Sequence, residues 1–362
     1  MSNIIDYIKW RGDLSFEQDG LNNLDMLILA RLSYLPLETI VPKSFDESIS
    51  VEEASYEFYI REMQDDVFWK KDPGFLKVVG KSERFKNLRL SASKCYMHRD
   101  SMIQFYALTI DLGGGKRCIS FRGTDNTLVG WQEGLSYYSL DTLPSQHKAL
   151  EYLESVAETY GGEFYLAGHS KGGNLAIYSA VSCSEETRGK IISVYNFDGP
   201  GVNEEVIRSK SFGAVRDKLK TFVPQSSVFG MMLEHDEEFS IIKSSKKSFM
   251  QHDIYSWEVA PTDFLYLDER TNSSYFINNT LNTLVDDMTP NEMNEFIDAV
   301  FKVMESSDKK TVNGLQRQWY KSYAKMLRSL VTLDKEERKL IFSTFAKAFK
   351  SAGKNIRKKE KD

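Results

Sequence analysis

The chain has 362 residues, a formal net charge of −5 and 41% hydrophobic residues. This length fits one large α/β domain with additions or two domains. The acidic balance argues against a dedicated nucleic-acid-binding protein, since such proteins carry a basic surface. The three cysteines lie far apart, at positions 95, 118 and 183, which argues against a disulfide framework or a metal cluster. We therefore expect a reduced, cytoplasmic protein without a cofactor or a bound metal.

We expect neither a secretory signal nor a membrane-spanning helix. The first 20 residues contain Asp6 and lack the basic start and apolar middle of a signal peptide. No apolar run approaches the roughly 18 residues that a membrane-spanning helix needs. Residues 353–362 are basic, and we expect them to form a disordered tail. The alternative is a weak attraction of this tail to anionic membrane surfaces.

The order of the predicted elements indicates an α/β fold. Apolar residues at helical spacing behind an asparagine predict a helix at residues 22–35, and we expect only short helices and loops in the mixed, charged stretch 51–100. Strand-like segments follow at residues 103–111, 116–121, 164–167, 192–201, 219–224 and 239–244. A helix is predicted at residues 147–160. Strands that alternate with helices predict βαβ units and a mostly parallel sheet.

The pattern changes near residue 262, beyond which it becomes helical. We therefore expect a first domain at residues 1–261 that includes the N-terminal helices. A C-terminal helical region at residues 262–352 and the basic tail would follow it.

Residues 164–180, FYLAGHSKGGNLAIYSA, place a serine in a glycine-rich turn between a strand and a helix. The pattern Gly168-x-Ser170-x-Gly172 fits the nucleophile elbow, a strained turn that leaves no room for side chains beside the serine. The turn also directs the backbone N–H of Lys171 toward the place where an oxyanion would form. We therefore expect Ser170 to be a nucleophile, with a merely tight turn as the alternative.

A serine nucleophile needs a histidine base, which follows the serine in the chain order of this fold. His98 and His147 lie well before the serine, and His169 is its immediate neighbour. His235 lies before the last predicted strand, whereas His252 lies after it, where a loop at the C-terminal edge of the sheet can reach back to Ser170. We expect His252 to be the base.

The acid that orients the histidine has two candidates. Asp198 ends the strand that follows the elbow helix, so it lies at the edge of the sheet where ligand-facing groups gather. The usual position is one strand later, but residues 225–227 contain no carboxylate, and Asp236 lies further on. We favour Asp198 over Asp236. The noncatalytic alternative for Asp198 is a turn aspartate that bonds to its own backbone.

The motif FRGT, residues 121–124, closes a strand before the elbow, where a second oxyanion donor is needed. The backbone N–H of Thr124 or of Asp125 is the candidate donor. We expect the side chain of Arg122 to brace this loop through bonds to carboxylates.

Four motifs together carry a resemblance to a known family. FRGT, GHSKGG, FDGPG and QHDIYSW resemble the class 3 lipases and, more closely, a bacterial lipase-like branch of the α/β-hydrolases, over residues 20–260. The resemblance implies an α/β-hydrolase fold with Ser170 as nucleophile, His252 as base, and Thr124 and Lys171 as oxyanion donors. Class 3 lipases carry the acid beside the VP of the later strand, where this chain has Thr221 and Phe222, so the acid is not transferred.

The resemblance implies a serine hydrolase that cleaves carboxylic esters, lipid-like or otherwise acylated, through an acyl-enzyme. Two alternatives stay open: a catalytically silent scaffold that binds a lipid or protein partner, and a thioesterase or peptidase with the same triad. Phe229, Met231 and Met232 lie on a segment near the histidine. Methionine-rich loops adapt to varied apolar ligands, so we expect these three residues to contact an acyl chain, with core packing as the alternative.

Overall fold

The structure is a computed structural model that describes residues 1–67, 69–98, 103–124 and 142–271, together with Ser274, Thr289, Glu292 and Glu295. The chain divides into two compact units. The first contains residues 1–96, 105–123 and 145–271, and the second contains residues 97–104, 124–144 and 272–362. The basic tail, and the expected helical region from residue 272 apart from four residues, lie outside the described residues.

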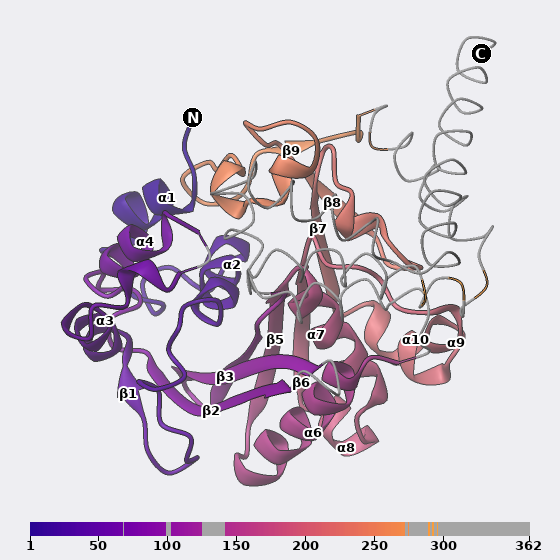
Figure 1. Cartoon of the computed structure of the whole chain (residues 1–362), viewed down its shortest axis with the longest axis horizontal. Coiled ribbons are helices and arrows are strands. Elements are labelled where there is room, and N and C mark those ends of the chain that lie inside the picture. Colours follow the sequence, from indigo (N-terminus) through magenta and orange to yellow (C-terminus); the bar gives the residue numbers. More distant parts are fainter. Residues whose placement is uncertain are drawn as a thin grey trace, which may run out of the picture. The chain divides into compact units, whose positions relative to one another are not determined.

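The described strands form one sheet whose spatial order follows the sequence (Figure 1). They are β1 Ile49–Ser50, β2 Arg89–His98, β3 Ile103–Gly113, β4 Lys116–Phe121, β5 Glu163–His169, β6 Ile191–Phe197, β7 Leu219–Pro224, β8 Phe239–Ile242 and β9 Tyr266–Leu267. Strands β4 to β8 pair in parallel, and antiparallel pairs lie toward both edges. The prediction of an α/β fold with a mostly parallel sheet is confirmed.

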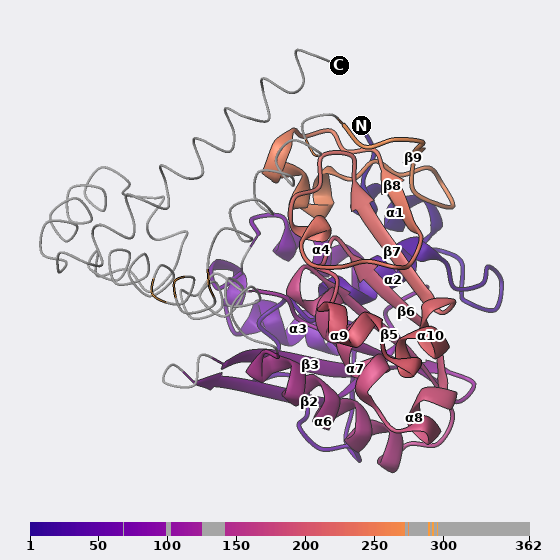
Figure 2. The same cartoon turned by 90° about the vertical axis from the view of Figure 1, so that its right-hand side faces the viewer.

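The described helices form an N-terminal group and a second group interleaved with the parallel strands. The N-terminal group consists of α1 Ile4–Arg11, α2 Asn23–Leu32, α3 Val51–Ile60, the short η1 Met63–Asp65 and α4 Asp72–Val79. The second group consists of α6 Pro144–Thr159, α7 Lys171–Ser182, α8 Glu185–Gly189, α9 Glu204–Ile207 and α10 Lys210–Arg216. Figure 2 shows α9 and α10 on the side that faces the viewer. Short 3-10 turns follow at η3 Phe229–Met231, η4 Ser248–His252 and η5 Ile254–Ser256.

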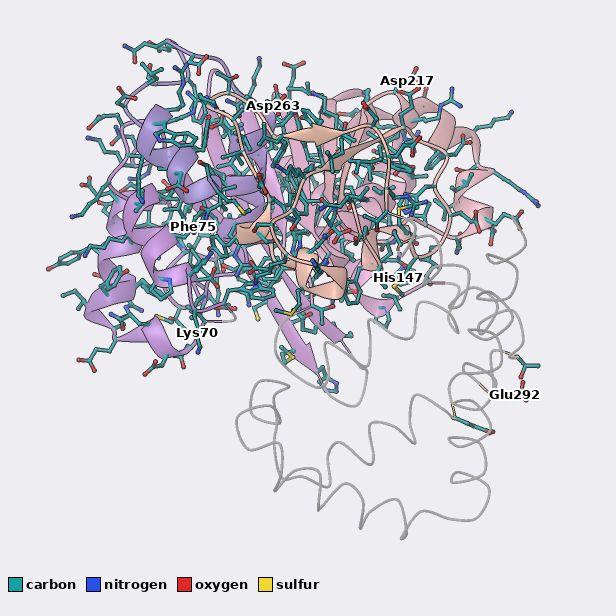
Figure 3. All side chains as sticks on the ribbon, turned by 90° about the horizontal axis from the view of Figure 1, so that it is seen from above. Lys70, Phe75, His147, Asp217, Asp263 and Glu292 are labelled. Atoms are coloured by element: carbon teal, nitrogen blue, oxygen red, sulfur yellow. The ribbon has the colours of Figure 1, made fainter. Side chains whose placement is uncertain are left out.

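Helix α2 packs on one face of the sheet and α7 on the other. Successive side chains of a strand point to opposite faces. On β6, Tyr195 and Phe197 belong to the core that the N-terminal helices share, whereas the Asn196 side chain between them lies beside Gly173 of α7. Phe75 of α4 is fully buried in the same N-terminal core, while Lys70 and Asp217 are exposed (Figure 3).

The prediction for residues 51–100 is wrong. Residues 51–100 were expected to contain only short helices and loops, yet β2 runs from Arg89 to His98. Its buried positions include Ser91, Ala92 and Ser93, and these small residues have little strand preference of their own. Pairing with its neighbours in the sheet therefore determines the conformation of β2. Strand β9 pairs with β8 past residue 261, and the first compact unit continues to Thr271.

Candidate active site

Ser170 occupies a strained turn between β5 and α7. Its backbone has φ 57° and ψ −134°, a conformation that costs a residue with a side chain about 1–3 kcal/mol. Its amide donates to the carbonyl of Phe197, 2.9 Å away, which fixes the turn against the end of β6. The serine precedes α7, but its hydroxyl makes no capping hydrogen bond to that helix. This strand–turn–helix geometry is that of the nucleophile elbow.

The elbow needs glycine because backbone segments approach each other closely there. A β-carbon on Gly172 would lie 2.2 Å from the carbonyl oxygen of Phe121, at the end of β4. The close contact brings the first turn of α7 to the C-terminal edge of the sheet. Helix α7 starts at Lys171, and the first amides of a helix have no acceptor within that helix. The backbone N–H of Lys171 is thus the first amide of α7 and directly follows Ser170.

Asp198 and His252 are directly hydrogen-bonded. Asp198 Oδ2 lies 2.6 Å from His252 Nδ1, although the two residues come from the end of β6 and from η4. The Asp198 side chain is 1% exposed and that of His252 is 16% exposed. Because an ionised carboxylate only accepts hydrogen bonds, this pairing places the proton of a neutral His252 on Nδ1. The Nε2 atom is then an acceptor.

The other oxygen of Asp198 has donors of its own. The Ser227 hydroxyl donates to Asp198 Oδ1 at 2.5 Å, and the amide of Gly230 donates to the same atom at 3.2 Å. Asp198 also has a positive φ of 52°. The carboxylate is therefore fixed in orientation, with one oxygen held by the loop after β7 and the other directed at the histidine.

The alternative acid and base have different partners. Asp236 is 55% exposed and lies 3.4 Å from Arg216 in a surface ion pair. His235 Nδ1 lies 3.0 Å from Glu237 Oε1, and that pair is buried. Burial raises the pKa of Glu237, whereas the hydrogen bond and the charge of His235 lower it, and the net effect is a lowered pKa.

A family comparison gives the chain its place among known proteins. A family model described as Mbeg1-like matches residues 79–302, which is more than half of the chain. The chain belongs to the Mbeg1-like family. A solved structure described as "Crystal structure of M37 lipase" matches with 17% sequence identity and a TM-score of 0.33, over 55% of this chain and 66% of that chain. The match thus spans just under two thirds of that lipase, and no curated protein matches.

The expected oxyanion donors of this Mbeg1-like chain stay predictions. Lys171 begins α7, and its long side chain is only 1% exposed, so the residue after the serine does not present its charge to solvent. Gly123 lies against the elbow, since a β-carbon on it would lie 3.1 Å from Ser170 Cβ. Thr124 follows Gly123 and belongs to the second compact unit. Asp125 lies outside the described residues.

The expected substrate residues lie on η3 and just after it. The Phe229 ring packs against the His252 ring, with centroids 4.4 Å apart. Met231 and Met232 are half-buried. An apolar surface therefore borders the histidine on the side of Phe229.

Sequence reasoning missed three residues of the candidate site. Ser227 and Gly230 orient Asp198, as described above. Gln251 accepts from the amide of Ser226 at 2.7 Å and donates to the carbonyl of Lys246 at 2.7 Å, which ties the histidine turn to the loop after β7. Ser227 follows the strand after which the acid usually stands, and this was the only signal for its role in the sequence.

The described part of the chain offers no clear metal centre. No group of three or more His, Cys, Asp or Glu side chains among those residues is arranged to hold a metal ion. Over the same residues, no helix combines the length and the apolar character needed to cross a membrane.

Proposed function

We propose that the chain is a serine hydrolase that cleaves carboxylic esters through an acyl-enzyme. The observation that carries the proposal is the Asp198–His252 hydrogen bond of 2.6 Å in a chain whose Ser170 has the strained elbow geometry. A histidine oriented by a buried carboxylate is the base that a serine nucleophile requires. A protein that only bound a ligand would need none of these three groups in this arrangement.

The proposed reaction proceeds in two halves. His252 Nε2 takes the proton from Ser170 Oγ as the oxygen attacks the ester carbonyl, and Asp198 stabilises the imidazolium that forms. The backbone N–H groups of Lys171 and Thr124 bind the oxyanion of the tetrahedral intermediate. The imidazolium then protonates the leaving alcohol. Water, activated by the same histidine, hydrolyses the acyl-enzyme and restores Ser170.

The acyl group of the proposed substrate is apolar. Phe229 packs against His252, and Met231 and Met232 follow it on the same segment. These side chains support a lipid-like or simple acyl ester, because aromatic and thioether groups favour contact with alkyl chains.

The proposal is tested by labelling the whole chain with a fluorophosphonate probe, followed by hydrolysis of a p-nitrophenyl ester series. We expect the wild type to be labelled, Ser170→Ala not to be labelled, and His252→Ala to be labelled far more slowly. Asp236→Asn is the matched control, because its carboxylate pairs with Arg216 at the surface. A folded wild type that is not labelled would refute the proposal and favour a silent binding scaffold.

A further inference from the structure

His169, the residue before the proposed nucleophile, contacts His252 in two ways. The two imidazole rings lie 4.4 Å apart between centroids, with an interplanar angle of 32°. His169 Nε2 also lies 3.0 Å from the backbone carbonyl oxygen of His252. His169 itself is only 2% exposed. The elbow strand is therefore joined to the histidine turn by a side chain for which the reaction scheme has no role.

The partners of His169 determine its protonation state. A carbonyl oxygen only accepts, so the bond to His252 requires the proton of His169 on Nε2. Burial, together with the nearby His252 and Arg31, holds the pKa of His169 well below its ordinary value. The ring is therefore neutral, and its Nδ1 is an acceptor that lies 3.2 Å from the Tyr34 hydroxyl. That hydroxyl is also 3.0 Å from the His169 carbonyl oxygen, so both acceptors share its proton.

The Arg122 side chain holds the backbone on both sides of Tyr34. Arg122 donates from Nε to the carbonyl of Ser33 at 2.5 Å and from Nη2 to that of Leu35 at 2.6 Å, on either side of Tyr34. It also pairs with Glu38, as the expected bracing role requires.

Arg31 and Gly123 also fit the position of Tyr34. The Arg31 guanidinium lies 4.5 Å from the centre of the Tyr34 ring, a favourable cation–π distance. A β-carbon on Gly123 would lie 2.0 Å from the Tyr34 hydroxyl and 2.4 Å from the His169 carbonyl oxygen. Glycine at this position of the FRGT motif therefore leaves the space in which Tyr34 reaches His169.

We propose that His169 is a positioning residue, which holds the His252 backbone through its Nε2–H and thereby keeps the His252 ring in the pose that pairs with Asp198, while Tyr34 fixes the orientation of His169. This inference rests on the proposed serine-hydrolase function. The neutral state of His169 matters because His252 becomes a cation when it accepts the serine proton. A second cation at this ring separation would oppose that step.

The test compares two substitutions, one that keeps the N–H donor of His169 and one that keeps its ring. His169→Gln keeps an N–H donor but loses the ring, and His169→Phe keeps a flat ring but loses the donor. The readouts are the rate of fluorophosphonate labelling and the low-field proton NMR signal of His252 Nδ1–H, which is assigned by its loss in His252→Ala. One neutral hydrogen bond corresponds to a factor of roughly three to ten. We expect His169→Phe to lose that factor in rate and to shift the signal, and His169→Gln to stay within about twofold of the wild type.

Two results would overturn the inference: a wild-type rate and signal in His169→Phe, or equal losses in both variants, which would leave only a packing role. Tyr34→Phe covers the case in which a His169 variant does not fold. We expect it to be folded, slower in labelling and shifted in the His252 signal, and a wild-type result would remove Tyr34 from the mechanism. The NMR signal needs no turnover. A wild type that is not labelled would therefore refute the hydrolase function, while the signal would still decide the role of His169.

Discussion

Asp198→Asn tests the site most sharply, because the surroundings of Asp198 determine how the new amide is oriented. Ser227 and Gly230 both donate to Asp198 Oδ1, and these donors select the amide oxygen for that position. The amide nitrogen then faces His252 Nδ1 in place of Oδ2. An amide nitrogen donates and does not accept, so the neutral histidine is forced to carry its proton on Nε2. In that tautomer His252 cannot take the proton of Ser170.

The expected loss is large in rate and small in stability. The wrong tautomer in a serine protease triad costs a factor of ~10⁴ in kcat, which corresponds to about 5.5 kcal/mol of transition-state stabilisation. We expect a loss of the same order in the labelling of Ser170 and in ester turnover. The hydrogen bonds from Ser227 and Gly230 are kept, so the melting temperature of Asp198→Asn should stay close to that of the wild type.

The assay compares labelling rates of the wild type, Asp198→Asn and Asp236→Asn at one pH. Exposed ion pairs such as Asp236–Arg216 contribute about 0–1 kcal/mol, so the Asp236 variant should be labelled like the wild type. Labelling of Asp198→Asn at the wild-type rate, or loss of labelling in Asp236→Asn, would refute the assignment of the acid.

A double variant tests whether the tautomer of His252 limits the reaction. Adding Ser227→Ala to Asp198→Asn removes the stronger of the two donors, so that the amide can turn its oxygen toward His252. We expect the double variant to regain about tenfold in labelling rate, the equivalent of one hydrogen bond. A double variant that is no faster than Asp198→Asn would show that the orientation of the amide is not what limits the reaction.

Three further predictions concern stability. Because burial holds the pKa of His169 well below 6.5, the unfolded chain binds a proton that the folded chain excludes as the pH falls below 6.5. The free energy of unfolding, measured with urea, should therefore fall by up to about 1.4 kcal/mol per pH unit below that pH. The His169→Gln variant should lack this part of the pH dependence. Gly172→Ala should destabilise by about 3 kcal/mol in the same assay, since its β-carbon would meet the Phe121 carbonyl. Asp72→Asn should cost about 3–5 kcal/mol by calorimetry, because it leaves the fully buried Arg31 without its counter-ion.

The parts of the fold that the sequence predicts are those specified by local pattern. Strand β7 has the expected bounds, Leu219–Pro224, because its β-branched and aromatic residues favour a strand and the final proline ends it. The strand, turn and helix around Ser170 follow from glycine spacing and from the change of apolar period. Within these elements, local residue types are enough to predict the backbone conformation.

Contacts between distant segments could not be predicted in this way. Tyr34 and His169 are 135 residues apart in the sequence, and neither residue lies in a pattern that indicates the other. Strand β2 was missed for a related reason: three of its four buried positions hold serine or alanine, and its strand conformation depends on neighbours in the sheet. Such features depend on packing between elements, which a single sequence does not encode as a local signal.

The acid is an intermediate case, and the sheet explains why. Strands β6 and β7 are parallel neighbours, with Phe197 opposite Phe222, so their C-terminal ends lie side by side at one edge. A carboxylate at either end can then approach the same histidine. In this chain Asp198 follows β6, and Ser227, which follows β7, donates to it. The proposed acid and its hydroxyl donor thus come from adjacent strand ends. The proposed nucleophile is different, because the G-x-S-x-G spacing that its backbone requires occurs once in the sequence. The motif alone therefore indicates Ser170 as the candidate nucleophile, whereas the candidate acid is located from the hydrogen bonds of the folded chain.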